Sequence, residues 1–400
     1  MQSLECSKGE TLRGKAIGLC VTGSIAAVET VKLARELRRH GASVLAVMSQ
    51  AAKDIIHPNA LEFATGQRVI DSITGGVEHV RFAGSGPGKL DLLLICPCTL
   101  NTLSKVANGI SDTPPTLFAA TALSHIPVIM VPTMHRTMYD GKAAQENMRR
   151  LRSMGVKVIE GKDEEGKMKM PSVERILFEV EKTLSRKDFQ GKRVLVTAGP
   201  TIERIDDVRF ITNKSTGKMG IAIAEELERR GADVRLVLGR TSEPTNIENM
   251  VRRETFEAMH NEVIYGGEFD IFVLAMAASD FTVEKRSGKV PSGEGFSLEF
   301  IPNKKIISEL RKRTSSMVVG FKAEYDVSED ELIERATSSL RRNGLDMVVA
   351  NDVGKDMRGF GHDTNEVFIV KRNGEVVHLP LVSKASIARG IADCIATLLD

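Results

Sequence analysis

The octapeptide NKSTGKMG at residues 213–220 combines two lysines, two hydroxyl side chains and two glycines directly before the helix-like run IAIAEELERRG. Backbone N–H groups at the start of a helix attract anions, so this composition is typical of a phosphate-binding loop. A Walker A loop has a glycine five residues before its Gly-Lys pair and Ser or Thr after it, whereas here these positions hold Thr212 and Met219. The sequence therefore indicates an anion site but excludes an ordinary P-loop ATPase or GTPase.

Polar residues also follow two strand-like runs near the N-terminus. Thr22-Gly23-Ser24 ends the run KAIGLCV, and Ser49 follows SVLAVM. The carboxyl ends of parallel strands meet at one edge of a sheet, where ligands of open α/β folds bind. A plain helix N-cap is nevertheless the commoner explanation of a single such turn. His79, considered alone, would be a solvated loop histidine.

Composition limits the class of protein. A chain of 400 residues predicts two or three domains, and the balance of 55 Lys and Arg against 53 Asp and Glu argues against a broad nucleic-acid or membrane surface. No apolar run approaches the roughly 20 residues of a membrane helix, and the N-terminus lacks the apolar core of a signal peptide. We expect a cytoplasmic protein without nucleic-acid or membrane partners.

The cysteines do not form a recognisable framework. There are five, at positions 6, 20, 96, 98 and 394, and an odd scattered set is not a disulfide pattern. Cys96-Pro-Cys98 lacks the second cysteine pair or nearby histidine that a zinc site needs. Cys20, Cys96 and Cys394 lie in apolar runs and are predicted to be core residues.

Two α/β halves follow one another along the chain. Buried-strand runs alternate with amphipathic segments from KAIGLCV to a helix over 172–185, and the plan restarts at RVLVTAGPT after the polar linker SRKDFQGKR. We predict two doubly wound, Rossmann-like domains, 1–188 and 189–400, the first of them flavodoxin-like. Asn373-Gly374 between alternating apolar residues predicts a hairpin before a C-terminal helix from about Ser383.

Motifs of the first half resemble those of the flavin-dependent cysteine decarboxylases. They are VTGSIAA, His79 with the valine after it, PCTLNTLSKVANGISD and PTMHRTMYD, and the resemblance covers residues 14–160. It implies FMN at a subunit interface of a trimer-based assembly, with His79 as the base beside the flavin and His135 holding the substrate carboxylate. The residues that it implies at the FMN are Gly23, Ser24, Ser49, Thr99, Leu100, Asn101, Thr102 and Met134.

The decarboxylation that the resemblance implies explains why a flavin is needed. A cysteine carboxylate cannot lose CO2 directly, because the carbanion left behind has no electron sink, and oxidation of the thiol supplies one. The chain departs from the bacterial pattern in having His135 instead of Asn, and in a flap segment, GKDEEGKMKMPS, without the cysteine that serves as proton donor. Both departures resemble archaeal members. We interpret the chain as a variant whose proton donor, with Lys167, Lys169 and His135 as candidates, is unassigned.

The stretch TAGPTIERIDDVRFITNKSTGKMG resembles the signature of phosphopantothenoylcysteine synthetase. This ligase is the partner of phosphopantothenoylcysteine decarboxylase, which is one of the flavin-dependent cysteine decarboxylases. The resemblance continues through AMAASDF, GKV, PNKKI, VVGFKAE and ANDV and covers most of residues 191–400. It implies that Asn213 contacts an acyl-nucleotide intermediate and that Arg209 belongs to the same site, with Ser215, Thr216 and Lys218 at the helix start. A buried structural asparagine is the alternative for Asn213. Two neighbouring steps on one chain point to the bifunctional enzymes of coenzyme A biosynthesis.

The same resemblance implies a nucleotide site. The ligase joins cysteine to 4′-phosphopantothenate after the carboxylate attacks the α-phosphate of a nucleotide, with Mg²⁺ to balance the triphosphate charge. CTP is the expected nucleotide, and ATP stays possible because two bacterial lysines before LD are replaced by LRRNG, where Arg341 or Arg342 could substitute. Metal ligands are not identified. The implied nucleotide-site residues are Met276, Ala277, Ala278, Asp280, Lys289, Asn303, Lys304, Lys305, Ile306, Phe321 and Arg342.

Three alternatives compete with this interpretation. A nicotinamide oxidoreductase is disfavoured because neither half has a G-x-G-x-x-G turn, and a phosphatase regulator because the chain has no acidic tail. A ligase with a degenerate flavin-binding domain is the serious competitor. The resemblance further implies a homo-oligomer that combines a trimeric flavin domain with a dimeric ligase domain, which gives a dodecamer.

Overall fold

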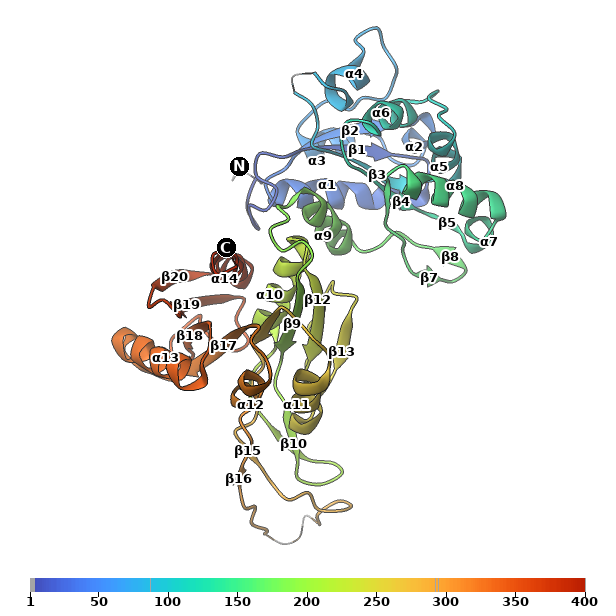
Figure 1. Cartoon of the computed structure of the whole chain (residues 1–400). Coiled ribbons are helices and arrows are strands. Elements are labelled where there is room, and N and C mark those ends of the chain that lie inside the picture. Colours follow the sequence, from blue (N-terminus) through green and yellow to red (C-terminus); the bar gives the residue numbers. More distant parts are fainter. Residues whose placement is uncertain (1–3, 87, 292, 294, 400) are drawn as a thin grey trace. The chain divides into compact units, whose positions relative to one another are not determined.

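The chain, seen in a computed structural model that describes residues 4–86, 88–291, 293 and 295–399, forms two compact units. Unit 1 is Met1–Ser185 and unit 2 is Arg186–Asp400 (Figure 1). Each has its own hydrophobic cores on both faces of a central sheet.

The main sheet of unit 1 is parallel, with the strand order β2-β1-β3-β4-β6. This is the flavodoxin-like order 2-1-3-4-5, and its switch point lies between β1 and β3. The fold predicted from alternating strand and helix patterns is therefore confirmed. The strands are β1 (Ala16–Val21), β2 (Ser43–Met48), β3 (Leu92–Cys98), β4 (Val128–Pro132) and β6 (Lys157–Val158).

Helices cover both faces of this sheet. Apolar residues of one group of helices pack in one core with alternate strand residues, and a second group packs in a second core on the other face. The first group is α1 (Thr30–Arg39), α3 (Pro58–Thr65) and α9 (Val173–Leu184); the second is α4 (Glu78–Ala83), α5 (Leu100–Ala107), α6 (Pro114–Ala122) and α8 (Lys142–Ser153). Short elements at strand ends are η1 (Ile25–Glu29), α2 (Gln50–Lys53) and α7 (Arg136–Tyr139). Cys20 and Cys96 are buried here, as predicted for core residues, and Cys98 is buried as well.

A second, small antiparallel sheet adjoins β4. It has the order β5-β8-β7 and consists of β5 (Met134–His135), β8 (Lys167–Met168) and β7 (Asp163–Glu164). Glu165 and Gly166 both have positive φ, 55° and 70°, which is the geometry of a two-residue type I′ hairpin turn. The segment expected to be a flap is therefore a β-hairpin joined to β5.

The sheet of unit 2 has the strand order β13-β12-β9-β14-β17-β18-β19-β20. Its parallel part follows the Rossmann order 3-2-1-4-5-6, and two antiparallel strands extend one edge. The hairpin predicted at Asn373-Gly374 joins the last two strands. The strands are β9 (Arg193–Ala198), β12 (Asp233–Leu238), β13 (Met250–Arg252), β14 (Ile271–Leu274), β17 (Met317–Glu324), β18 (Met347–Asp352), β19 (Thr364–Lys371) and β20 (Val376–Ser383).

Helices again divide between the two faces. One core contains α10 (Lys218–Arg229) and α14 (Lys384–Ala396), and the other contains α11 (Phe256–Tyr265), α12 (Ile306–Arg313) and α13 (Glu329–Asn343). Ser383 caps α14, so the predicted C-terminal helix is confirmed. Two small hairpins, β10 (Ile202–Arg204) with β11 (Phe210–Thr212) and β15 (Phe281–Thr282) with β16 (Ile301–Pro302), extend from the sheet as an arm (Figure 1).

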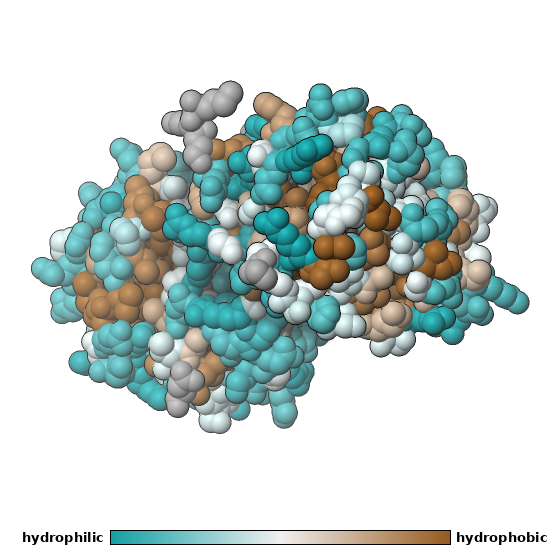
Figure 2. Space-filling model, turned by 90° about the horizontal axis from the view of Figure 1, so that it is seen from above, coloured by the Kyte–Doolittle hydropathy of each residue, from teal (hydrophilic) through white to brown (hydrophobic). Residues whose placement is uncertain are grey.

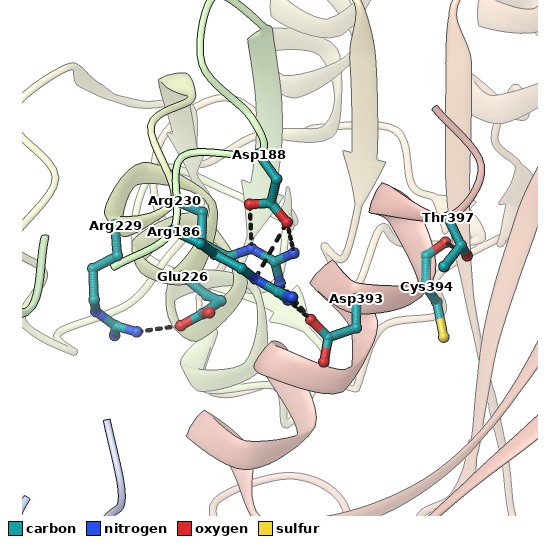
Figure 3. A network of polar contacts seen from close by, with 8 residues as sticks. All are labelled: Arg186, Asp188, Glu226, Arg229, Arg230, Asp393, Cys394 and Thr397. Atoms are coloured by element: carbon teal, nitrogen blue, oxygen red, sulfur yellow. Dashed lines mark hydrogen bonds and ion pairs between the residues drawn. The ribbon is translucent and has the colours of Figure 1, made fainter. Parts of the chain in front are cut away.

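Residues of the predicted linker SRKDFQGKR form side-chain contacts with the rest of unit 2. Arg230 is 1% exposed and bonds the carboxylates of Asp188 and, at 2.7 Å, Asp393 (Figure 3). Its guanidinium also lies 4.9 Å from the ring of Phe189, which is fully buried. Arg186 joins the network through Asp393. The segment therefore belongs to the packed structure of unit 2 instead of forming a free connection.

The surface seen in Figure 2 is mainly hydrophilic, with apolar side chains in separate groups. Exposed apolar residues of unit 1 include Ile73, Val77 and Val80 around α4, each about half exposed. Within the described part of the chain, no helix is both long and apolar enough to span a membrane.

Candidate active sites

The first candidate site lies where β1, β3 and β4 end in unit 1. Thr22 is buried; its hydroxyl donates to the carbonyl of Pro97 at 2.7 Å and accepts from the N–H of Thr99 at 3.0 Å. The hydroxyl of Thr133 donates to Oγ of Ser24 at 3.1 Å. Side-chain hydrogen bonds thus hold the turns after three strands together.

Three short helices begin at this edge. Ser24 caps η1, Ser49 caps α2 and Thr99 caps α5, and each side chain accepts from a backbone N–H of the helix that it caps. A β-carbon on Gly23 would lie 2.5 Å from Cβ of Ala51, so only glycine permits this turn to contact the start of α2. The N-cap interpretation and the anion-site interpretation are thus compatible, because remaining N–H groups of each first turn point toward the same edge.

The other predicted flavin residues surround these caps. Thr102 is buried and accepts from the hydroxyl of Thr99 at 3.2 Å, Asn101 is exposed in the first turn of α5, and Leu100 and Met134 pack against the core. The structure therefore brings the candidate set together at one edge. Its members are Gly23, Ser24, Ser49, Thr99, Leu100, Asn101, Thr102 and Met134.

His79 lies far from this edge in the same chain. It is half-buried in the first turn of α4, and the carbonyl of Phe82 in that helix accepts from the N–H of Leu90 at 2.7 Å. From Leu90 to Thr99 the chain runs along β3 and spans roughly 25–30 Å at about 3.3 Å per residue. One protomer therefore does not bring His79 to the strand-end site.

His135 lies beside the hairpin. In the β5–β8 ladder it is directly opposite Lys167, while Met134 is opposite Met168. Met134 and Met168 pack against the core, so His135 and Lys167 share the solvent face. Among the described residues His135 forms no side-chain hydrogen bond, although it occupies the N-cap of α7. Its imidazole is therefore available to a ligand.

The second candidate site lies where β9 and β14 end in unit 2. Gly199 and Gly217 both have a φ of 84°, and a β-carbon on Gly217 would lie 3.1 Å from N of Gly199. A β-carbon on Gly220 would lie 2.7 Å from the carbonyl of Thr197. The glycines of the NKSTGKMG loop thus let α10 approach the end of β9 closely. The helix begins at Lys218, not at Ser215 as predicted, because Gly217 has the left-handed conformation.

Asn213 connects this loop to the next strand end. Its side-chain amide donates to the carbonyl of Ala277 at 3.1 Å and, more weakly, to that of Ala278 at 3.4 Å. Ala277 is itself bridged to Gly199, whose carbonyl accepts from its N–H at 3.0 Å. Asn213 is exposed, so the buried-asparagine alternative is wrong. Its carbonyl oxygen is left for a ligand beside Met276, Ala277 and Ala278.

Arg209 organises the arm. Its guanidinium donates to the Asp206 carboxylate and to the carbonyl of Val290, both at 3.1 Å. Asp206 is buried, which opposes ionisation, but backbone N–H groups of Arg209, Val208 and Val290 outweigh this and lower the pKa of Asp206. Lys289, just before Val290, is exposed. Arg209 therefore holds the loop that carries Lys289.

Polar residues predicted for the nucleotide form a connected group. Lys305 donates to Asp280 at 2.5 Å. The side-chain amide of Asn303 donates to Glu203 at 3.0 Å and to the carbonyl of Ser279 at 3.1 Å. Lys304 is exposed beside them. Glu203 is a connecting residue that the sequence analysis missed; its place opposite β11 in a short hairpin gave no periodic signal.

Two further candidates are apolar residues, one half-buried and the other buried. Phe321 in β17 is half-buried against the α10–α14 core, and Ile306 is 4% exposed in the core under α12. Ile306 can therefore offer a ligand only its backbone. Asn351 in β18 lies two residues beyond Val349, the register partner of Phe321, and shares its face of the sheet. It is a polar side chain beside Phe321 that the sequence analysis did not single out.

Arg342 does not join this group in one chain. It lies in the last turn of α13, which starts after the carboxyl end of β17 and is about 22 Å long. This helix returns the chain to the start of β18, so Arg341 and Arg342 occupy the opposite edge of the sheet.

Lys218 is already paired. Its Nζ donates to Asp363 at 2.7 Å and to the carbonyl of Gly361 at 3.3 Å, and Glu243 lies 3.9 Å away. The hydrogen bond to Asp363 raises the pKa of Lys218. In the described residues, no three His, Cys, Asp or Glu side chains form a cluster that could hold a metal ion.

Comparisons with known proteins match both units. Residues 5–185 match the family Flavoprotein, and residues 189–399 match the family DNA/pantothenate metabolism flavoprotein C-terminal domain. The chain is 48% identical to the coenzyme A biosynthesis bifunctional protein CoaBC of Thermococcus kodakarensis, over 98% of each chain. It is 38% identical to the protein of that name from Methanocaldococcus jannaschii, over 92% of this chain and 91% of the relative. A crystal structure of the C-terminal domain of a CoaBC protein aligns with 53% of this chain and 98% of its own, at 33% identity and a TM-score of 0.43.

Proposed function

The chain belongs to the family of coenzyme A biosynthesis bifunctional proteins, and on that premise we propose that it carries out two consecutive steps of coenzyme A biosynthesis. Residues 189–400 ligate cysteine to 4′-phosphopantothenate, and residues 1–188 decarboxylate the 4′-phosphopantothenoylcysteine formed. The observation that carries the proposal is the match to one relative along 98% of both chains, which covers both candidate sites.

The ligase step uses the strand ends of unit 2. The start of α10 and the glycine turns offer N–H groups to a nucleotide phosphate, and Asn213 spans the gap to Ala277 beside them. The substrate carboxylate attacks the α-phosphate, pyrophosphate leaves, and the cysteine amine then attacks the mixed anhydride. We propose that the nucleotide is CTP and that Mg²⁺ binds its phosphates. Phe321 supplies a face for the base, and Lys289, Lys304 and Lys305 balance phosphate charge.

The decarboxylase step uses the strand ends of unit 1. FMN fits this edge because its phosphate can accept from the N–H groups of the first turns of η1, α2 and α5, and the closeness of Gly23 to Ala51 brings two of these turns together. Bound FMN supplies the electron sink that loss of CO2 from a cysteine carboxylate requires. His135 presents an unbonded imidazole to hold that carboxylate.

A complete flavin site needs a second copy of the chain. His79 and the strand-end residues lie at opposite ends of β3 in one protomer, and exposed apolar residues surround α4. We therefore propose that His79 of one copy acts at the site of a neighbour, in a trimer of the flavin domain. With dimers of the ligase domain this gives a dodecamer, whose mass light scattering can measure.

The test is mass spectrometry of the purified protein incubated with 4′-phosphopantothenate, cysteine, Mg²⁺ and either CTP or ATP. We expect 4′-phosphopantetheine and CMP in the CTP reaction. Accumulation of 4′-phosphopantothenoylcysteine instead would support the second candidate, a ligase with a degenerate flavin-binding domain. That candidate is favoured by the absence of a cysteine from residues 160–171. If neither 4′-phosphopantetheine nor 4′-phosphopantothenoylcysteine were formed, both proposals would be overturned.

A further inference from the structure

Decarboxylation requires a proton donor. The inference about this donor rests on the proposed decarboxylase function. When the C–C bond to the carboxylate breaks, CO2 leaves and its electron pair stays with the substrate. The net reaction replaces the carboxylate by hydrogen, so an acid must deliver one proton to the same carbon. The acid must therefore lie beside the group that holds the carboxylate.

Several acids near this edge are excluded by their surroundings. Burial raises the pKa of Cys98 to about 12, and its thiol donates to the carbonyl of Thr99. Burial and the Glu160 carboxylate raise the pKa of Tyr139 to about 12. Lys169 is paired with Glu164 at 3.0 Å and with Glu165 at 3.5 Å, which raises its pKa. A group stabilised in its charged form by partners is a poor proton donor.

Lys167 has a different environment. The β5–β8 register sets it directly opposite His135, and side chains so paired have Cβ atoms about 4.5–5.5 Å apart. On its other side Glu164 is its partner in the β7–β8 ladder, but the carboxylate of Glu164 bonds Lys169. Within the described residues Lys167 forms no ion pair. It is exposed, and its ammonium is free to move toward a substrate.

The hairpin fixes this placement. Met134 and Met168 face the core, so a register slip of one residue would expose both. The N–H of Arg136 donates to the carbonyl of Gly166 at 2.9 Å, which attaches the hairpin tip to the start of α7. At the base, a β-carbon on Gly161 would lie 1.6 Å from the carbonyl oxygen of Lys169, so the two hairpin arms are in close contact there.

The hairpin also lies within reach of the strand-end site. Thr133 bonds Ser24, and His135 follows two residues later, about 7 Å further along an extended chain. Lys167 is the next position across the ladder, and its side chain extends about 6 Å beyond Cα. An imidazole that holds the carboxylate would therefore have an ammonium beside it.

We propose that Lys167 is the proton donor of the decarboxylation. An N–H bond of its ammonium breaks as the C–H bond forms at the carbon that lost CO2, and the neutral amine regains a proton from water. His135 holds the departing carboxylate. The lysine thereby performs general acid catalysis, which typically contributes 10²- to 10⁴-fold to a rate.

Single-turnover reactions with 4′-phosphopantothenoylcysteine test this assignment in the full-length holoenzyme. In Lys167→Met we expect CO2 release but at least a hundredfold slower formation of 4′-phosphopantetheine. An enethiol two mass units lighter should accumulate, because the two hydrogens removed when the thiol is oxidised would stay on the bound flavin. Lys167→Arg keeps the charge but not a usable acid, and should behave like Lys167→Met. Lys167→Cys restores an acid and should recover the rate to within tenfold. Lys162→Met, an exposed lysine of the same segment, is the matched control and should be unaffected.

A readout without turnover tests the geometry. Mild oxidation of a His135→Cys/Lys167→Cys variant should form a cross-strand disulfide that reductant reverses, whereas His135→Cys/Lys162→Cys should not. Wild-type product formation in Lys167→Met, full activity in Lys167→Arg, or no disulfide would overturn the assignment. Absence of CO2 from the wild-type protein would instead overturn the proposed decarboxylase function, and the assignment with it.

Discussion

Lys218, the first residue of α10, donates to the carboxylate of Asp363 at 2.7 Å, so the cation at the start of the proposed phosphate-binding helix is neutralised before a nucleotide arrives. Lys384 lies behind this pair, 8% exposed, and donates from Nζ to the carbonyl of Gly359 at 3.0 Å. Lys218 at the start of α10 and Lys384 at the start of α14 thus attach residues 359–363 to two helices. A nucleotide phosphate would compete with Asp363 for Lys218.

We therefore predict that Asp363→Asn strengthens nucleotide binding. Asp363 is 88% exposed, and exposed ion pairs are worth about 0.2–1 kcal/mol, so the dissociation constant for CTP should fall by up to about fivefold. Isothermal calorimetry with Mg²⁺-CTP measures this change. Asp356→Asn removes the same charge from the same loop at an exposed position and is the control. Equal effects of the two substitutions would show that loop charge, not the ion pair, matters.

A second prediction concerns the contact between Gly217 and Gly199. Gly217→Ala places a β-carbon at a φ of 84° and 3.1 Å from backbone N of Gly199, so strain and steric overlap add. We expect unit 2 to lose about 2–3 kcal/mol of unfolding free energy and ligation to be lost, while decarboxylation of added 4′-phosphopantothenoylcysteine persists.

Gly374→Ala is the matched control for this contact. Its φ of 89° imposes similar strain, but nothing lies within 4 Å of the added β-carbon. Urea unfolding should therefore register a smaller loss, near 1 kcal/mol, with ligation intact. If Gly374→Ala were equally harmful to ligation, the close approach of α10 to β9 would not be the reason for Gly217.

The buried strands and the doubly wound α/β class followed from patterns that a single sequence contains. Runs such as LDLLLIC are long enough and apolar enough to indicate buried parallel strands, and Asn373-Gly374 indicates its hairpin through the positive φ that its turn needs. The β7–β8 hairpin was not predicted, because two-residue strands have no measurable period. Its turn has a non-glycine residue, Glu165, at positive φ, which no sequence rule favours.

The positions of the site residues that the sequence did not predict depend on tertiary contacts. α10 begins at Lys218 and not at Ser215, because Gly217 has the left-handed conformation where it packs against Gly199, and this contact joins residues 18 apart in sequence. The interpretation of Arg342 assumed only its place in the sequence, whereas the length of α13 determines which sheet edge it reaches. Partners such as Glu203 are identified only by their contacts.

A third prediction follows from the buried carboxylate of Asp206. Three backbone N–H groups hold its folded-state pKa below the unfolded value of about 3.9, so its contribution to stability is fully present above that value. It is lost as the pH falls through the folded-state pKa. Asp206→Asn should therefore lower the unfolding free energy at pH 6, and its difference from wild type should shrink below about pH 4.

Urea unfolding from pH 2.5 to 6 measures this difference. Asp356→Asn, which removes an exposed carboxylate, is the control. A difference between Asp206→Asn and wild type that stays constant over the whole range would mean that the carboxylate acts through its shape and not through its charge. Loss of ligation at pH 7 in Asp206→Asn is also expected, since Asp206 and Arg209 hold the loop that carries Lys289.

The last prediction concerns Arg230, the buried centre of the network that fastens residues 186–189 to unit 2 (Figure 3). Arg230→Met removes the buried cation between Asp188 and Asp393 and leaves the two carboxylates only the exposed Arg186, which should cost about 3 kcal/mol of the unfolding free energy of unit 2. Arg186→Met breaks contacts to the same carboxylates from a side chain that is 57% exposed, so its cost should stay below about 1 kcal/mol. Differential scanning calorimetry of the full chain distinguishes the units if each has its own transition, and only the unit 2 transition should move. Equal shifts for both substitutions would mean that Arg230 contributes no more than a surface ion pair and that the segment is held mainly by the burial of Phe189.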